Sequence, residues 1–217
     1  MVLFLLLVCG FCWSIVYIKL IHLGFRYKAC GIPFIALALN FAWESVNSYF
    51  DLKGNVLNIT TYITLIWLCL DILVILTYLL YGKHYFPKHT NKEYFWPWTL
   101  IIFIMSFVIQ YFFIIELGDL AKFYSAFIQN LIMSISFIIM FVGRPDIKGQ
   151  SLTIAINKCI GTLAATISSS IILHSGLIIT LGIFCFIFDT AYIYFLSHIK
   201  RLHSDFLKSS AKIISKS

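Results

Sequence analysis

Three carboxylic acids, Glu44, Asp71 and Asp189, lie inside strongly apolar stretches of the sequence. A charged side chain at bilayer depth costs several kcal/mol, so an ionisable residue in such a stretch usually marks a functional site. Lys158 is the one basic residue that falls clearly inside an apolar stretch. The acids therefore outnumber the buried bases, and at least one of them is expected to be protonated. A protonated carboxyl group in an apolar, aromatic-rich cavity can deliver a proton to a bound substrate.

The composition excludes a soluble protein. The chain has 217 residues, of which 61% are hydrophobic and 12% are charged, whereas a soluble domain carries about twice that charged share. A bilayer is crossed by roughly 20 apolar residues, and stretches of about that length recur along the chain. They cover 2–19, 30–50, 57–81, 99–115, 121–142, 152–173 and 176–198. We predict an all-α bundle of seven transmembrane helices over residues 1–198, followed by an amphipathic tail over 199–217.

The distribution of basic residues predicts the orientation of the chain. Most lysines and arginines, including Arg26, Lys83 and Arg144, fall at one set of helix ends, whereas Lys53 and Lys122 fall at the other. The positive-inside bias then places the C-terminus in the cytoplasm and the N-terminus outside. The net charge of +7 reflects this topology and contact with anionic lipid, so no nucleic-acid partner is expected. The location is a bacterial inner membrane or an endoplasmic reticulum, and the sequence does not indicate an oligomeric state.

Neither the cysteines nor the histidines form a cofactor or metal site. The cysteines fall in or beside the apolar stretches, where thiols act as small hydrophobic groups. The histidines are scattered through loops and helix ends, and their spacing resembles no metal motif. We therefore expect no cofactor and no metal. The first apolar stretch has its positive charges after it, so we interpret it as a retained anchor helix and not as a signal peptide.

Polar residues recur at helical spacing within the apolar stretches. They form one face on each of five predicted helices: Asn40, Glu44, Asn47, Ser48 and Asp51; Thr64, Trp67, Asp71 and Tyr78; Asn130 and Ser134; Lys158, Thr162 and Ser169; and Cys185, Asp189 and Tyr192. Lipid cannot satisfy such groups, so these faces are expected to turn toward one another. For the amides and hydroxyls, simple hydrogen bonding between helices is the better explanation.

The sequence leaves open which acid has a basic partner. Asp71 and Lys158 are predicted to lie at similar depths from the cytoplasmic side, so they could form a structural pair. That pairing would leave Glu44 and Asp189 without an evident base. These two acids are therefore the sharper catalytic candidates.

Several short motifs follow one another along the chain. They are Asn40-Phe41-Ala42-Trp43-Glu44, Trp67 with Asp71, Tyr81-Gly82, Gln129-Asn130 through Ser134, Arg144, Gly149-Gln150-Ser151, Lys158 with Gly161-Thr162, and Asp189 with Tyr192. In this order, the motifs resemble the small seven-helix membrane terpene cyclases of fungal and bacterial meroterpenoid and indole-diterpene pathways. The resemblance spans residues 30–195.

The resemblance implies an acid-initiated, metal-independent cyclase. In the family, a prenyl chain attached to a head group is protonated at a terminal epoxide or an alkene and closes into fused rings. The two acids essential in the family correspond to Glu44 and Asp189. Aromatic faces can stabilise the carbocation without attacking it, and Trp43, Trp67 and Tyr192 are the candidates. The resemblance does not define the head group of the hydrophobic, prenylated substrate.

A small seven-helix transporter is the alternative. Its membrane carboxylates would serve as a proton relay. Against it, the sequence has no Pro-Gln dipeptide, and its first three predicted helices do not resemble its last three.

Overall fold

The computed structural model describes residues 1–87, 89–144 and 146–214, with side chains described over these ranges up to residue 199 and at Arg201. This part of the chain is helical and contains no strand. The α-helices are α1 (Val2–Tyr27), α2 (Phe34–Lys53), α3 (Ile59–Tyr81), α4 (Phe95–Leu117), α5 (Ala121–Gly143), α6 (Leu152–Leu173) and α7 (Gly176–Ile214). The described residues also form three short 3-10 helices. η1 (Gly82–Tyr85) and η2 (Lys92–Tyr94) lie between α3 and α4, and η3 (Gly118–Leu120) lies between α4 and α5. Each predicted apolar stretch overlaps one α-helix, which confirms the all-α class.

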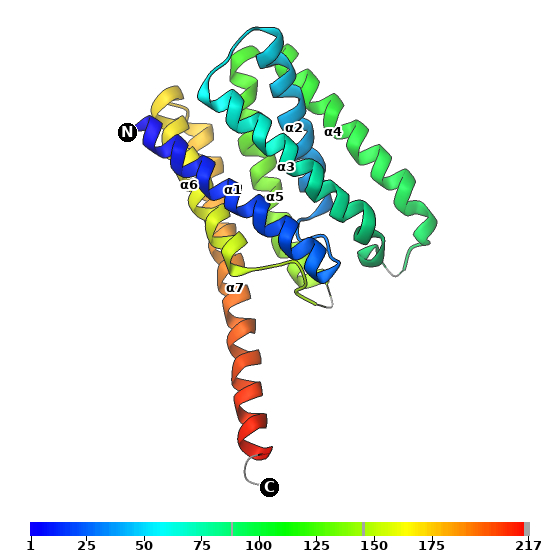
Figure 1. Ribbon diagram of the computed structural model, residues 1–217. Coiled ribbons are helices and arrows are strands. Elements are labelled where there is room, and N and C mark those ends of the chain that lie inside the picture. Colours follow the sequence, from blue (N-terminus) through cyan, green and yellow to red (C-terminus); the bar gives the residue numbers. More distant parts are fainter. Residues whose placement is uncertain (88, 145, 215–217) are drawn as a thin grey trace.

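Five described stretches are long and apolar enough to cross a membrane. They are Val2–Tyr27, Ile59–Tyr85, Lys92–Gly143, Leu152–Leu173 and Gly176–Ile199. The third of them contains both α4 and α5, which fold back on each other at η3 (Figure 1). α2 is not among the five, because its polar face lowers its hydropathy. The count of seven spans and the orientation of the termini stay predictions. The predicted tail falls on the end of α7 and on residues 215–217, which lie outside the described residues.

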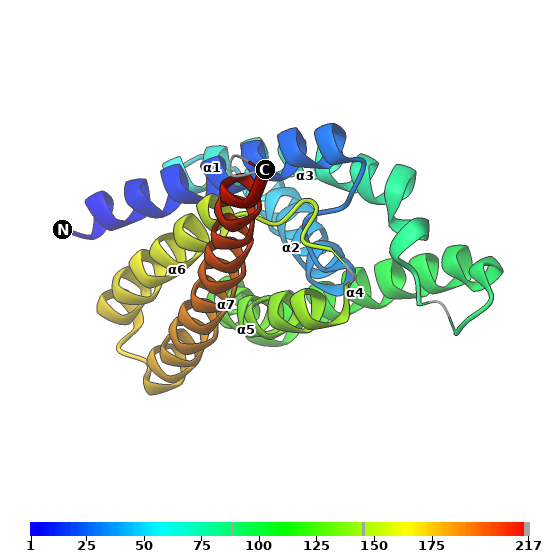
Figure 2. The same ribbon diagram turned by 90° about the horizontal axis from the view of Figure 1, so that it is seen from below.

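The helices pack around α2. This helix contacts α3, α4 and α5, while α1 contacts both α3 and α6, and α7 contacts α5 and α6. Seen from below, α2 lies in the interior of the bundle (Figure 2). The helix that carries Asn40 and Glu44 is therefore enclosed by its neighbours.

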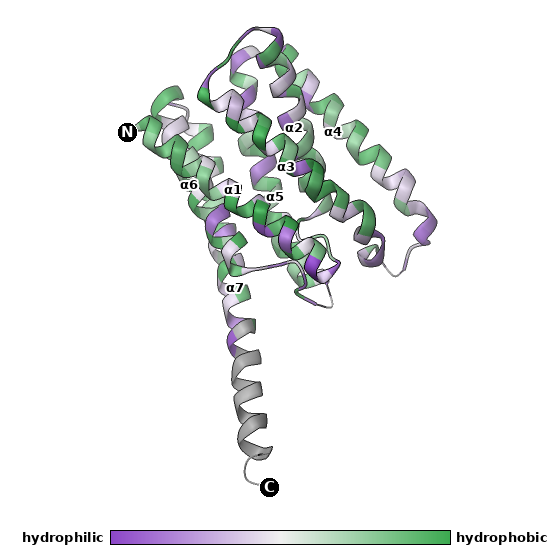
Figure 3. Cartoon of the chain, in the orientation of Figure 1, coloured by the Kyte–Doolittle hydropathy of each residue, from purple (hydrophilic) through white to green (hydrophobic). Residues whose placement is uncertain are grey.

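The outer faces of the bundle are apolar, and its buried polar groups lie inside beside an apolar core. Large apolar side chains cover the outer faces, with Val142 74% and Leu100 62% exposed, in agreement with the hydropathy colouring (Figure 3). Glu44, Asp71 and Asp189 are at most 2% exposed. This confirms the predicted inward orientation of the polar faces, because water and lipid are both kept away from these groups.

Two interhelical loops meet through glycine residues. Gly31 precedes α2, and Gly149 lies between α5 and α6 with a φ of 80°. A Cβ atom on Gly31 would overlap the backbone carbonyl oxygen of Gly149, which no rotamer change can relieve. The contact therefore joins the start of the central helix to the start of α6.

Gly31→Ala is expected to destabilise the protein by about 1–3 kcal/mol through overpacking. Thermal unfolding in detergent would measure the loss. Gly176→Ala is the matched control, because nothing lies within 4 Å of the added Cβ atom. Equal unfolding temperatures for the two variants would show that the loop contact is not tight.

Candidate active site

A cavity of about 140 Å³ lies between α1, α2, α3, α5 and α6. Its lining residues are mostly apolar or aromatic: Cys9, Trp13, Tyr17, Asn40, Trp43, Glu44, Trp67, Ala126, Phe127, Gln129, Asn130, Met133, Thr162 and Ala165. Among these described residues, Glu44 is the only carboxylic acid. The cavity therefore combines one acid with an aromatic wall.

The two carboxyl oxygens of Glu44 have different surroundings. Oε1 accepts hydrogen bonds from the Tyr17 hydroxyl and from the Asn40 amide, the latter over 2.9 Å. Oε2 is buried and has no hydrogen-bond partner among the described residues. One oxygen is thus fixed by two donors, and the other is left for a proton or a ligand.

Asp71 belongs to the same hydrogen-bonded cluster. The Asn40 amide nitrogen lies 2.9 Å from Asp71 Oδ2 and 2.6 Å from the Tyr17 hydroxyl, so it links both acids. Asp71 is fully buried but does not line the cavity. The predicted pair between Asp71 and Lys158 is wrong, because α1 packs between α3, which carries Asp71, and α6, which carries Lys158.

Lys158 pairs with Asp189 instead. Its Nζ atom lies 2.7 Å and 2.9 Å from the two carboxyl oxygens of Asp189 and donates to Ser134 Oγ over 2.7 Å. Lys158 and Asp189 are 1% and 2% exposed. The expectation that Asp189 lacks a basic partner is therefore wrong, since the contact between α6 and α7 brings the two residues together. Asp189 does not line the cavity, so the structure places Glu44 and Asp189 in separate clusters.

The ion pair is connected to the cavity wall through α5 and α6. Asn130 lies one turn from Ser134, and Thr162 lies one turn from Lys158. Asn130 Nδ2 donates to Thr162 Oγ1 over 2.9 Å, and both residues line the cavity. The predicted supporting residue Asn130 therefore contributes to the cavity wall. Among the described residues, no group of three potential metal ligands is found.

The aromatic wall differs from the predicted one. Trp43 and Trp67 line the cavity as expected, but Tyr192 does not. Tyr192 packs against Phe137 at a centroid distance of 5.2 Å and donates its hydroxyl to Gln150 Oε1 over 2.9 Å. It is therefore a packing residue outside the cavity.

Sequence reasoning missed two aromatic residues of α1. Trp13 and Tyr17 both line the cavity, and the Tyr17 ring lies 6.3 Å from that of Trp67. Their spacing of four residues puts them on one helical face, and Ser14 beside them accepts from the Trp67 indole over 3.3 Å. This spacing was the available signal that the first helix contributes to the site.

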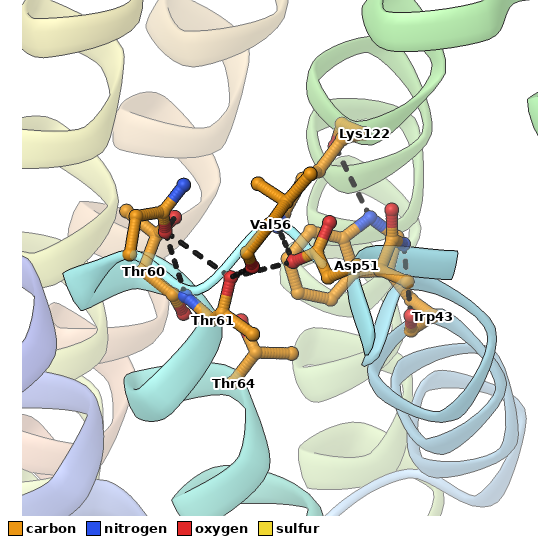
Figure 4. A network of polar contacts seen from close by, with 9 residues as sticks. Trp43, Asp51, Val56, Thr60, Thr61, Thr64 and Lys122 are labelled. Carbon is orange, nitrogen blue, oxygen red and sulfur yellow. Dashed lines mark hydrogen bonds and ion pairs between the residues drawn. The ribbon is translucent and has the colours of Figure 1, made fainter. Parts of the chain in front are cut away.

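A polar network at one end of the bundle fixes Trp43 (Figure 4). The Trp43 indole donates to the carbonyl oxygen of Lys122 over 3.1 Å, and Lys122 Nζ lies 2.6 Å from Asp51 Oδ2. Asp51 also accepts from the Thr61 hydroxyl over 3.0 Å. The network joins α2, α3 and α5, and it uses the one polar group of the Trp43 side chain.

Comparisons with known proteins identify the family of the chain. A family model described as Pyr4-like transmembrane terpene cyclases matches residues 1–202. A "Pyr4-family terpene cyclase mfmH" from Annulohypoxylon moriforme is 24% identical over 164 residues, covering 74% of this chain and 66% of the relative. A "Terpene cyclase pyr4" from Aspergillus fumigatus is 24% identical over 212 residues, covering 90% of this chain and 86% of the relative. No solved structure matches the chain. The protein is therefore an integral membrane protein and belongs to the Pyr4-like transmembrane terpene cyclases.

Proposed function

We propose that this protein protonates the prenyl chain of a meroterpenoid-type substrate and directs the cyclisation of the resulting carbocation. The observation that carries the proposal is Glu44, a buried acid in an aromatic-walled cavity with one oxygen fixed and the other without a partner. The similarity to terpene cyclases supports this reading and does not favour the transporter alternative.

Glu44 is proposed to hold the starting proton on Oε2. Glu44 and Asp71 share the Asn40 amide, and no basic residue pairs with either of them among the described residues. Two carboxylates this close repel each other when both are charged, so one shared proton stabilises the pair. The donors on Oε1 hold the carboxyl group in one orientation, which leaves Oε2 to reach the substrate.

The proposed reaction is an isomerisation. Glu44 transfers its proton to a terminal epoxide, the carbon–oxygen bond breaks, and the oxygen becomes a hydroxyl group. An alkene of the chain attacks the cationic carbon and closes a ring, and loss of a proton from the last cation restores neutrality. Protonation of a terminal alkene would start the same sequence. The substrate gains one proton and loses one, so its mass is unchanged.

The walls are proposed to protect the cation. Trp43 and Trp67 are held by hydrogen bonds from their indole N–H groups to Lys122 and Ser14, and both line the cavity. An aromatic face attracts a cation within about 6 Å and does not trap it as a nucleophile would. Exclusion of water also prevents early quenching of the cation.

Asp189 is proposed to act as a positioning residue. Both of its carboxyl oxygens contact Lys158 Nζ, and Asp189 does not line the cavity. Through Lys158 and Ser134 it holds α5, α6 and α7 together behind Asn130 and Thr162. Its importance would then come from the shape of the cavity wall.

Product analysis tests the proposed reaction. Membranes from cells expressing the protein would be supplied with prenylated phenols, with and without a terminal epoxide. We expect a cyclised isomer of unchanged mass that is absent from control membranes. Recovery of every substrate unchanged would contradict the proposal, and the substrate that reacts would identify the initiating group.

Tyr17→Phe is expected to lower turnover about tenfold, because it removes one hydrogen bond that orients Glu44. The phenyl ring keeps the packing against Trp13 and Trp67, so the folded protein should accumulate normally. Tyr192→Phe is the matched control, since its hydroxyl bonds to Gln150 outside the cavity. Equal turnover in the two variants would exclude a role for the Tyr17 hydroxyl.

A further inference from the structure

A second and larger cavity is not used by the proposed reaction. It has a volume of about 550 Å³ and lies among the ends of α2, α3, α4 and α5. It shares no lining residue with the cavity that contains Glu44. α4 and α5 are joined at η3 and diverge toward their other ends (Figure 1). Residues at those ends, from Phe95 of α4 to Gly143 of α5, line this second cavity. We call it the α4–α5 crevice.

Arg144 supplies a positive charge to the crevice. It follows the last residue of α5, and its Nη1 atom donates to the Cys30 carbonyl oxygen over 2.6 Å. Its guanidinium carbon lies 4.4 Å from the Tyr85 ring centroid, so the plane of the group is held in place. These two contacts restrict Arg144 before any ligand arrives.

The charge of Arg144 is only partly compensated. Among the described residues no carboxylate forms an ion pair with it, and the nearby Asp146 is paired with Lys148 over 3.8 Å. Burial lowers the pKa of the Arg144 guanidinium because the charge has lost part of its water. A half-buried cation with free N–H donors is a favourable place for an anion.

The remaining walls of the crevice are apolar and open outward. Ile139 is 65% exposed, Trp98 45% and Ile35 39%. In an integral membrane protein these faces meet the acyl chains of the bilayer. The crevice therefore presents an apolar groove to lipid with a cation at its end.

We propose that the α4–α5 crevice binds an anionic phospholipid, with the phosphate on Arg144 and one acyl chain along Ile139 and Trp98. A guanidinium can donate two parallel hydrogen bonds to a phosphate. In a zwitterionic choline lipid, the positive choline group compensates the phosphate charge, so an anionic lipid is attracted more strongly to Arg144. Lys28 and Lys83 are exposed at this end of the bundle and favour anionic lipid in the adjoining leaflet. The proposal rests on the membrane location and not on the chemistry of Glu44.

Native mass spectrometry of the full chain in neutral detergent tests the proposal. Phosphatidylglycerol and phosphatidylcholine with the same acyl chains would be added separately, and the retained lipid would be counted. We expect about tenfold stronger retention of phosphatidylglycerol, which corresponds to about 1.4 kcal/mol. Arg144→Gln should reduce this preference at least fivefold, whereas Arg144→Lys should keep part of it. Lys92→Gln, at an exposed position before α4 that forms no ion pair among the described residues, should leave it unchanged.

Two further measurements separate the contribution of the lipid phosphate from that of the acyl chain. Ser136→Trp should reduce retention of phosphatidylglycerol while Arg144 is still present, because the indole fills the crevice. Soluble glycerol phosphate should not displace the lipid. Wild-type retention by Arg144→Gln, or an equal loss in Lys92→Gln, would overturn the proposal. Displacement by glycerol phosphate at the same concentration as the lipid would assign the site to a soluble phosphate instead.

Discussion

Glu44→Gln is expected to reduce cyclisation by about 10²–10⁴-fold, the usual contribution of a general acid. Glutamine keeps the length of the side chain and a carbonyl oxygen that can accept from Tyr17 and Asn40. It removes the transferable proton. Folding should be preserved, because the amide places no charge in the cavity. Turnover of a substrate that the wild-type protein cyclises, normalised to folded protein, is the measurement.

The same substitution at an exposed position is the control. Glu116 lies at the end of α4 on the surface, so Glu116→Gln should cyclise at the wild-type rate. Cyclisation by Glu44→Gln at the rate of Glu116→Gln would remove Glu44 from the acid role. Loss of folded protein in Glu44→Gln alone would instead assign Glu44 to the structure of the bundle.

Breaking the buried ion pair is expected to have the largest effect on stability. Lys158→Met leaves Asp189 as an uncompensated buried charge, which costs about 3–5 kcal/mol. Replacing both partners, as in Lys158→Met with Asp189→Leu, should recover most of that loss because no buried charge remains. Thermal unfolding of the wild type, the two single variants and the double variant forms the cycle. Additive losses in the double variant would show that the pair contributes no coupling.

The double variant also distinguishes the two roles considered for Asp189. A positioning residue acts through the fold, so cyclisation should return together with the folded protein. A proton donor or acceptor is needed in the reaction itself, so a folded but inactive double variant would contradict the positioning role. The single variants cannot decide this, because both are expected to lose folded protein.

The helices could be predicted from the sequence, but the pairing of the acids could not. Runs of apolar residues and a helical period of polar residues fix which segments are helical and which faces turn inward. The positions of residues within the predicted helices also indicate how deep each residue lies in the membrane. Asp71 and Lys158 are predicted as partners because these depths are similar. Depth does not determine which helices are neighbours. The position of α1 between α3 and α6 decides that Asp71 joins Glu44 through Asn40, and that Lys158 joins Asp189.

The contribution of α1 shows a second limit of the sequence. An N-terminal apolar helix with few polar residues is interpreted as a membrane anchor, because neither its composition nor its charges indicate that it contributes to a site. Tyr17 becomes a site residue only because α1 packs against α3 and α6 and thereby faces Glu44. The aromatic spacing of Trp13 and Tyr17 indicated a shared face, but not the partner of that face.

The central claim is that Glu44 carries the proton that starts cyclisation. Infrared difference spectroscopy of the protein in membranes measures this directly, because a protonated carboxyl group has a carbonyl band distinct from that of a carboxylate. At neutral pH we expect such a band in the wild type, a shift of that band in heavy water, and its persistence in Asp71→Asn and in a folded Asp189→Asn. Adding Glu44→Gln to Asp71→Asn should abolish it, because neither acid of the pair can then hold a proton. A band that is lost in Asp71→Asn alone, a band that persists in the double variant, or a wild-type spectrum without one would contradict the account.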